Sequence, residues 1–285
     1  MGHLSIAIVG PGRLGTALAI SLTNSGYRIE EIVLRRERKS SASARAVAKK
    51  VGARSTQSES ARLDADLVWF CVPDSNITEA ARELSDRNWK SRVAIHSSGV
   101  LTSDALAALR KRGASVASVH PLMTFVRGSV PDLSGVMFAV EGDARAVRVV
   151  STIVRDLGGE TVLVKKEAKP AYHAFTTMIC PLLLALLASA ERVAGFAGIT
   201  PPNARRRMLP IIQETLRNYV RLGPEKAFTG PIVRGDLDTI RLHLKALSLL
   251  PSAKNGYITL ALAAIEYLPS RNRKQLKAML YEANY

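Results

Sequence analysis

Cysteine, aromatic residues and acidic charge are all scarce in this sequence. Its 285 residues include two cysteines, Cys71 and Cys180, and no C-x-x-C pair, which excludes a disulfide-stabilised scaffold. We expect both cysteines to be core residues in a reducing compartment. The histidines and cysteines show no metal-ligand spacing, so we expect no bound metal. The apolar run at the N-terminus is short and leads into a glycine turn, so we expect no signal peptide and a cytoplasmic protein.

The charge balance is strongly basic. Lys and Arg number 40 against 24 Asp and Glu, which gives a formal net charge of +16. Nucleic acid is one partner that such an excess suggests. The basic residues are scattered, however, and the densest cluster, at 205–207, has no aromatic residues among it. We therefore expect no nucleic-acid partner and a surface that favours anionic cofactors and substrates.

An uncharged run at 171–190 approaches the roughly 20 residues needed to span a bilayer. It carries Tyr172, His173 and Pro181 and stands alone in the chain, so we expect no membrane partner. A helix at the centre of a helical domain or of a homodimer is the interpretation that we adopt.

A glycine motif, IVGPGRLG, lies between a predicted buried strand at 4–9 and a predicted amphipathic helix at 13–24. In a dinucleotide-binding turn, Gly10 permits the bend, Gly12 lets a pyrophosphate approach the backbone, and Gly15 lets the helix pack closely on the strand. Backbone N–H groups at the helix start would face the anion. The predicted cofactor-binding residues of this turn are Gly10, Pro11, Gly12, Arg13, Leu14 and Gly15.

The first 165 residues alternate between strand and helix patterns. Predicted strands follow at 29–34, 67–72, 93–95, 116–119, 136–140 and 161–164, with helices at 43–51, 77–84, 103–110 and 144–157. This order predicts an α/β domain of the Rossmann type, with a doubly wound, mainly parallel sheet and ligands at the carboxyl ends of the strands.

The remainder of the chain has helical patterns only. These lie at 170–195, 203–222, 236–249, 253–268 and 271–285. We therefore predict two domains, a nucleotide-binding domain at 1–165 and an all-helical domain at 166–285 for substrate binding and dimerisation.

The residues after the second strand indicate which nucleotide binds. In this fold an acidic residue at that place takes the ribose of NAD, whereas arginine accommodates the 2′-phosphate of NADP. Arg35 and Arg36 stand there in the run IVLRRERKSS. NADP(H) is therefore the predicted cofactor and NAD the less favoured alternative; a solvated basic face is the structural alternative.

Six motifs together carry a family resemblance: GPGRLG, FCVPDSNI, IHSSG, SVHPLMTF, KPAYHAF and GPIVRGD. With them the chain resembles, over essentially its whole length, a bacterial family of candidate NADP oxidoreductases whose C-terminal domain has no known function. Ketopantoate reductases, pyrroline-carboxylate reductases and the 6-phosphogluconate and β-hydroxyacid dehydrogenases are related in fold. The resemblance implies a Rossmann domain, NADP and a C-terminal domain like that of 6-phosphogluconate dehydrogenase. It implies no substrate.

Three predicted strands deliver further candidates to one edge of the sheet. Val72 and Pro73 end one strand, where the nicotinamide should lie, and we expect Asp74 or Ser75 to cap the following helix. A plain turn between strand and helix is the alternative there.

The next two strands end in IHSSG and SVHP. Ser97 is a predicted cofactor contact, and Ser98 and His120 are predicted catalytic residues. A structural histidine is the alternative for His120.

Lys169 and His173 form the sharpest candidate pair, because a spacing of four places both on one helical face. The resemblance to hydroxyacid dehydrogenases suggests a lysine proton donor with an amide residue four positions later, here replaced by histidine. Pro170 predicts that Lys169 is a cap residue outside the helix. A solvated lysine beside a core histidine is the alternative.

The motif GPIVRGD reads as a loop that leads into a helix. Arg234 is a candidate clamp for a substrate carboxylate, and Asp236 is the predicted N-cap and a second substrate-site residue.

These observations predict an NADP-dependent oxidoreductase. Hydride would pass between nicotinamide and a small, anionic carbonyl or imine compound in a cleft between the domains. A non-catalytic NADP-binding redox sensor or scaffold is the rival interpretation. The identity of the substrate, and whether a deazaflavin replaces it, stay open at this point.

Overall fold

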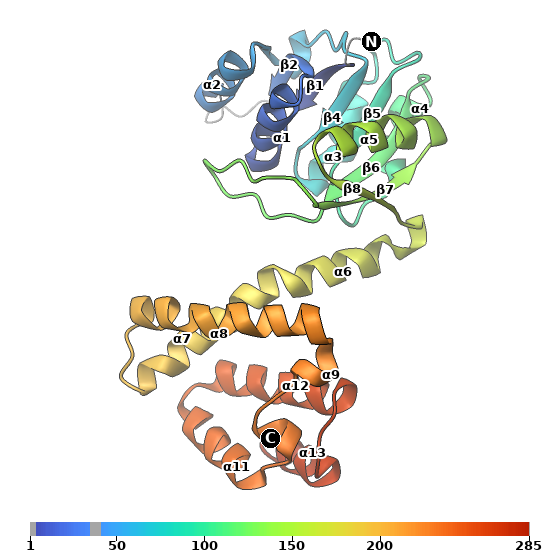
Figure 1. Cartoon of the computed structure of the whole chain (residues 1–285). Helices are drawn as coiled ribbons and strands as arrows, with labels where there is room; N and C mark the ends of the chain where they lie inside the picture. The colour runs from blue at the N-terminus through green and yellow to red at the C-terminus, as the bar shows by residue number, and fades with distance from the viewer. Residues whose placement is uncertain (1–3, 35–40, 285) are drawn as a thin grey trace. The chain divides into compact units, whose positions relative to one another are not determined.

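The protein divides into two compact units. The computed structural model describes residues 4–34 and 41–284, and the units are Met1–Thr177 (unit 1) and Met178–Tyr285 (unit 2) (Figure 1). Unit 1 contains the α/β fold, and unit 2 is helical.

Unit 1 is built on an eight-stranded sheet with the order β3-β2-β1-β4-β5-β6-β7-β8. Neighbouring strands run parallel except for β6 and β7, which are antiparallel. The strands are β1 (Ser5–Val9), β2 (Arg28–Leu34), β3 (Arg54–Gln57), β4 (Leu67–Phe70), β5 (Val93–His96), β6 (Ser115–Pro121), β7 (Met137–Gly142) and β8 (Glu160–Leu163). The predicted Rossmann-type, mainly parallel sheet is confirmed.

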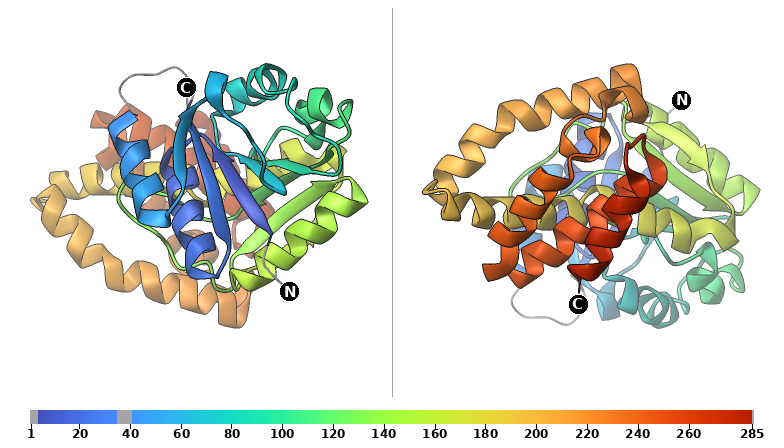
Figure 2. Two further views of the ribbon diagram at one scale, coloured as in Figure 1. Left: turned by 90° about the horizontal axis from the view of Figure 1, so that it is seen from above. Right: turned by 90° about the horizontal axis from the view of Figure 1, so that it is seen from below.

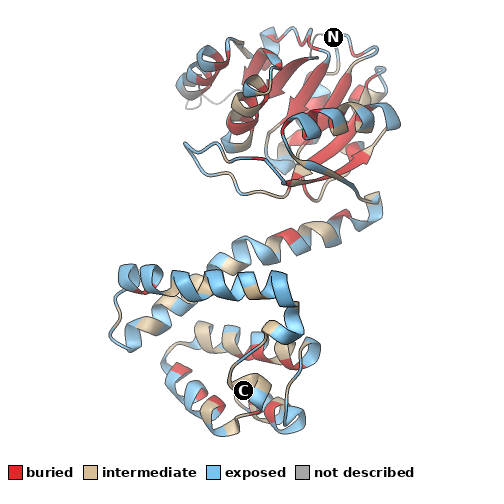
Figure 3. Ribbon diagram, in the orientation of Figure 1, coloured by how far each residue is buried: buried red, intermediate tan, exposed pale blue. Residues whose placement is uncertain are grey.

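Helices cover both faces of this sheet, as Figure 2 shows from above. One hydrophobic cluster packs α1 (Arg13–Asn24), α2 (Ser41–Val51) and α5 (Ala144–Asp156) on one face. A second packs α3 (Asp74–Glu83) and α4 (Ala107–Arg110) on the other. The central strands are buried on both sides, which explains why their sequences lack polar alternation (Figure 3).

Short 3₁₀ turns complete unit 1. They are η2 (Ser58–Ser60), η3 (Ser103–Leu106) and η4 (Lys166–Ala168), and the last leads into α6 (Lys169–Ile179).

Unit 2 consists of helices, as predicted. They are α7 (Pro181–Phe196), α8 (Pro201–Leu222), α9 (Pro224–Ala227), α10 (Pro231–Arg234), α11 (Leu237–Ala246), η5 (Leu247–Leu249), α12 (Pro251–Tyr267) and α13 (Arg273–Glu282). Proline begins α7 to α10 and α12, where its missing N–H costs nothing and its fixed φ suits the first turn. The core joins α11, α12 and α13 through residues such as Ile240, Ile265 and Leu276.

The single helix expected at 170–195 is two helices. Cys180 separates α6 from α7 with a non-helical backbone (φ −122°, ψ −81°). Pro181 cannot donate to the preceding turn and disfavours helical backbone at Cys180, so a new helix begins there. By length and composition alone, the stretch 166–196 would suffice to cross a membrane, and little of it is buried.

Candidate functional site

The glycine turn between β1 and α1 has the geometry that the motif predicts. Gly10 has φ +95°, and its N–H donates to the Val33 carbonyl at 2.9 Å. A Cβ on Gly10 would lie 2.7 Å from Cγ1 of Val72, and a Cβ on Gly15 would lie 2.2 Å from the Gly10 oxygen. A Cβ on Gly12, in contrast, would meet nothing within 4 Å. Two glycines therefore permit close packing, and the third leaves open space.

That open space lies beside the start of α1, where the first backbone N–H groups have no helical partner. The first turn of α1 carries no acidic residue. Arg13 is exposed, and Pro11 and Leu14 are half-buried around the turn. The free N–H donors, the positive end of the α1 helix dipole and the open space at Gly12 together suit the pyrophosphate of a dinucleotide.

The residues predicted to select NADP, Arg35 and Arg36, lie outside the described residues. The strand before them, β2, pairs with β1 in parallel, Val33 beside Val9. The chain therefore leaves β2 at the same sheet edge as the glycine turn. The buried carboxylate of β2, Glu31, accepts hydrogen bonds from the Leu63 N–H and the Thr56 hydroxyl, both at 2.9 Å. These hydrogen bonds hold the Glu31 carboxylate in the protein interior, so Glu31 is not placed to contact a ribose at the sheet edge.

At the end of β4, Pro73 is the N-cap of α3, which begins at Asp74 and has no side-chain cap. The prediction that Asp74 or Ser75 caps this helix is therefore wrong. Asp74 instead accepts a hydrogen bond from the Ser98 hydroxyl at 2.7 Å. This hydrogen bond joins the start of α3 to the loop that follows β5.

The hydroxyl groups of the two serines after β5 form hydrogen bonds within the protein. Ser97 accepts from the Trp69 indole N–H at 2.8 Å. Ser98 is buried, and its Oγ accepts from the Leu101 N–H at 2.9 Å while donating to Asp74. The Ser98 hydroxyl therefore closes the loop after β5.

Lys169 is fully buried (0% exposed). Its Nζ donates to the Ser98 carbonyl at 3.0 Å and to the Ser118 hydroxyl at 2.6 Å. Burial lowers the pKa of this amine to about 8, although the carboxylates of Glu141 and Asp74 oppose the shift. Lys169 is the first residue of α6, with helical backbone (φ −57°, ψ −40°), so its predicted place outside the helix is wrong. Its ammonium ties α6 to the ends of β5 and β6.

Next to it lies a cluster of three aromatic side chains. Nδ1 of His120, near the end of β6, lies 2.8 Å from Oη of Tyr172 on α6. The His120 and His173 rings are edge-to-face with centroids 6.1 Å apart. A Cβ on Gly99 would lie 2.5 Å from Cδ2 of His173 and 3.1 Å from Nε2 of His120. Both imidazoles therefore pack against the bare backbone of Gly99, and this close approach requires glycine there.

Burial sets the protonation of this cluster. Burial, together with the positive charge of Lys169 and the neighbouring His173 and against the carboxylate of Asp74, lowers the pKa of His120 to about 4. Burial also raises the pKa of Tyr172 to about 12. At neutral pH the pair is therefore a neutral imidazole and a protonated phenol joined by one hydrogen bond.

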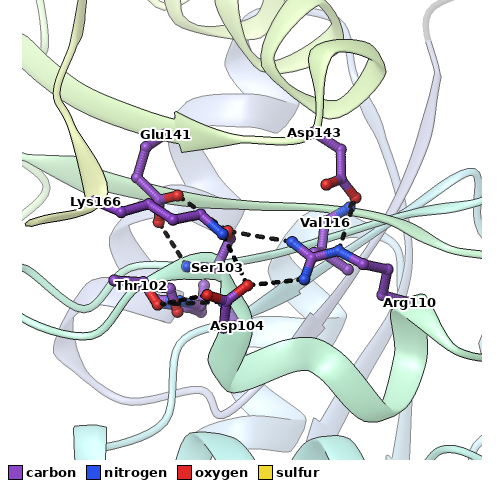
Figure 4. Close-up of polar contacts among 9 residues, drawn as sticks. Thr102, Ser103, Asp104, Arg110, Val116, Glu141, Asp143 and Lys166 are labelled. Atoms are coloured by element: carbon purple, nitrogen blue, oxygen red, sulfur yellow. Dashed lines mark hydrogen bonds and ion pairs between the residues drawn. The ribbon is translucent and has the colours of Figure 1, made fainter.

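A charged network anchors the segment that leads into α6 (Figure 4). Lys166 and Arg110 each approach Oδ1 of Asp104 to 2.8 Å. These hydrogen bonds lower the pKa of Asp104 to about 2. Arg110 also pairs with Asp143, which accepts the Val116 N–H at 2.8 Å. The network fixes η4, and with it the start of α6, against the sheet.

The GPIVRGD motif lies in unit 2 and has a local structural purpose. Gly235 is left-handed (φ +66°) and packs on the Arg271 carbonyl, which a Cβ would approach to 2.6 Å. Asp236 caps α11 by accepting from the Thr239 N–H at 3.1 Å, as predicted. Arg234 is largely exposed and lies 4.0 Å from Asp236. Binding of substrate by Arg234 and Asp236 stays a prediction.

Unit 1 thus brings four predicted catalytic residues together: Ser98, His120, Lys169 and His173. Tyr172 was not predicted, although the run YH in the first turns of α6 places it beside His173 in sequence. Across residues 4–34 and 41–284, no group of three or more His, Cys, Asp or Glu side chains could hold a metal.

Two family models match the chain: a Rossmann-like domain over residues 1–121, and a domain of unknown function, DUF2520, over residues 136–264. Residues 1–121 are therefore similar to a Rossmann-like domain, and residues 136–264 are similar to DUF2520. The resemblance drawn from the sequence motifs is thereby confirmed. No curated protein matches the sequence.

Solved structures share this fold over nearly the whole chain. A candidate NADP oxidoreductase from Bacteroides fragilis is 23% identical, with a TM-score of 0.78 over 92% of this chain and 98% of its own. An imine reductase from Pseudomonas sp. is 16% identical, with a TM-score of 0.67 over 99% of both chains. A pyrroline carboxylate reductase from Plasmodium falciparum, solved with NADP bound, is 14% identical. Its TM-score is 0.61, and the match covers 100% of this chain and 98% of its own. The two matched parts therefore together form a fold that these solved structures share.

Proposed function

We propose that the protein is a cytoplasmic NADP-dependent oxidoreductase that reduces a small, anionic carbonyl or imine compound. One observation carries the proposal. The open space at Gly12, beside the start of α1, lies at the same sheet edge as the polar ends of β5 and β6, because these strands are parallel. A dinucleotide bound at the turn would extend along this edge toward them.

The residues divide into those that hold the cofactor and those that face the substrate. The glycine turn would hold the pyrophosphate, Arg35 and Arg36 the 2′-phosphate, and Val72, Pro73 and Ser97 the nicotinamide end. When bound, NADPH supplies a hydride. The relatives named above as imine and pyrroline carboxylate reductases support a C=N or C=O group as the acceptor.

Lys169 is better suited to positioning than to proton donation. Its ammonium is fully buried and donates to Ser98 and Ser118, so it holds the loop after β5 and the start of α6 in place. His120 and His173, which pack against Gly99 at this edge, would lie on the substrate side of the site.

We also propose that the protein is a homodimer. Among the described residues α7 has no buried side chain, and α8 buries Ala204 alone. Leu182 is 55% exposed and Val220 84% exposed. Apolar faces of this extent favour a partner, and a second copy of the chain offers a matching face.

Titration calorimetry with NADPH and NADH tests the cofactor assignment. We expect tighter binding of NADPH, and we expect Arg35→Asp with Arg36→Ala to remove that preference while leaving NADH binding intact, because only the 2′-phosphate contacts are lost. Equal affinities in the wild type, or an unchanged ratio in the double variant, would contradict the assignment. A protein that binds NADPH tightly but turns over no carbonyl or imine compound would fit the rival function, a redox sensor.

A further inference from the structure

We propose that Tyr172 is the catalytic proton donor of this site and that His120 holds and supports its hydroxyl group. The inference rests on the proposed reduction and adds to it a residue that lies in the motif KPAYHAF but to which the sequence analysis gave no role. It also moves proton donation away from Lys169.

Tyr172 is accessible to a substrate, whereas Lys169 is not. Its ring is half-buried, whereas the Lys169 amine is enclosed and bonded to Ser98 and Ser118. The Tyr172 hydroxyl meets a single hydrogen-bond partner among those described, Nδ1 of His120 at 2.8 Å, and the two rings are edge-to-face at 83°. A phenol oxygen has further hydrogen-bonding capacity, so it can contact a substrate atom while it keeps this bond.

His120 fixes the position of the phenol. The imidazole packs against the Gly99 backbone and edge-to-face against the His173 ring. Because burial keeps His120 neutral at pH 7, it carries one N–H. With that proton on Nδ1, His120 donates to Oη of Tyr172 and leaves the hydroxyl proton free for a substrate.

The proton balance of the step is simple. Bound NADPH would supply the hydride for the new C–H bond, and the electron pair of the C=O or C=N bond would move onto oxygen or nitrogen. That atom takes the proton from Oη of Tyr172, the O–H bond breaks, and the Nδ1–H of His120 stabilises the phenolate. Solvent water then returns a proton to the phenolate.

The acidity of Tyr172 suits this task. A phenol whose pKa is about 12 stays protonated through the physiological range. It is nevertheless a stronger acid than an alcohol, whose pKa is close to the roughly 15.7 of water, so proton transfer to a forming alkoxide is downhill.

Tyr172→Phe tests the inference, and the chain offers a matched control. In unit 2, Oη of Tyr257 lies 3.1 Å from Nδ1 of His243, in the same edge-to-face arrangement. Both variants are assayed for NADPH affinity and for NADPH-dependent reduction of pyrroline-5-carboxylate, 2-oxo acids and 3-oxo acids. We expect Tyr172→Phe to lower kcat/KM by roughly 10²- to 10⁴-fold with NADPH affinity unchanged, and Tyr257→Phe to match the wild type.

The pH profile separates a chemical role from a structural one. The wild-type kcat/KM should be level between about pH 6 and 7.5, below the pKa of about 8 of the positioning amine of Lys169, whereas the residual rate of Tyr172→Phe should fall with rising pH over the same range because the proton then comes from solvent. A wild-type rate that falls above pH 8 reflects deprotonation of Lys169, whose pKa is about 8, and this is expected for a positioning amine as well as for a proton donor. Wild-type turnover retained by Tyr172→Phe together with that fall would assign donation to Lys169, and retained turnover with any pH profile would overturn the inference. Absence of wild-type turnover on every probe would overturn the proposed function, and this inference with it.

Discussion

At the scale of single residues, buried titratable groups hold the site in one protonation state. His96 at the end of β5 is fully buried between two fixed partners. Its Nε2 lies 2.9 Å from the Thr102 carbonyl, and its Nδ1 accepts the Ser98 N–H at 3.1 Å. A second proton would have to sit on Nδ1, facing that N–H. Burial, together with the charge of Lys169, accordingly lowers the pKa of His96 to about 4, although the hydrogen bond to the Thr102 carbonyl opposes the shift.

We expect unit 1 to lose stability in mild acid for this reason. Because the folded pKa is below the unfolded value, the unfolded chain binds more protons between about pH 6.5 and 4, so the free energy of unfolding falls as the pH falls through that window. For His96 the loss is about 2 kcal/mol at pH 5. Urea unfolding followed by tryptophan fluorescence reports unit 1, because both tryptophans, Trp69 and Trp89, are buried there.

The variant His96→Gln separates the contribution of His96 to the acid-induced loss of stability from the contributions of other titratable groups. It should be less stable than the wild type at pH 7, since two buried hydrogen bonds are disturbed, but should lose less stability on going to pH 5. Exposed His243 supplies the control, and His243→Gln should behave as the wild type. An equal acid loss in wild type and His96→Gln would contradict the account.

At the scale of elements, the turn between β1 and α1 assigns separate tasks to its glycines. Gly12 has extended backbone (φ −73°) and open space, so alanine fits there without strain. We expect Gly12→Ala to leave the melting temperature unchanged and to weaken NADPH binding by about tenfold or more, because the methyl group occupies the pyrophosphate position. Gly15→Ala, whose Cβ would lie 2.2 Å from the Gly10 oxygen, should destabilise unit 1 by about 1–3 kcal/mol.

Calorimetric titration and thermal melts of both variants check this division. Gly195→Ala is the control, because Gly195 lies within α7 with nothing within 4 Å of its Cβ position. It should leave NADPH affinity unaltered. A normal affinity in Gly12→Ala would show that no phosphate approaches this backbone.

Local sequence patterns predicted most of the elements of unit 1. The helix α1 has the predicted bounds, 13–24, because strand, glycines and apolar spacing agree there. The strand β3 was missed, since its sequence RSTQ is polar and only half-buried at the sheet margin. The break at Cys180 was also missed, although Pro181 supplied the signal.

The site was less predictable than the fold. The ends of β5 and β6 lie at one sheet edge, as expected, because parallel strands bring their carboxyl ends together, and the roles of their residues stay predictions. The partner of His120 is 52 residues away on another element, and no local pattern encodes such a contact. Burial of the Lys169 amine likewise depends on how α6 meets the sheet.

At the scale of the whole molecule, unit 2 exposes more apolar surface than a lone helical unit needs. We expect light scattering to give twice the chain mass of 30.8 kDa at micromolar concentration. Leu182→Glu with Leu186→Glu on α7 should yield monomers, because charge would enter the apolar face. Leu242→Glu, on α11 and 67% exposed, is the control and should stay dimeric. A wild-type monomer would remove the dimer proposal.

We propose that this protein transfers hydride from NADPH to a C=O or C=N carbon. Incubation of the wild-type protein with NADPH deuterated at C4 of the nicotinamide and the panel of pyrroline-5-carboxylate, 2-oxo acids and 3-oxo acids, followed by mass spectrometry of the products, tests this transfer. We expect a reduced product that carries one deuterium on the former carbonyl or imine carbon, and none without protein. Tight NADPH binding with no deuterium in any product would exclude the proposed hydride transfer.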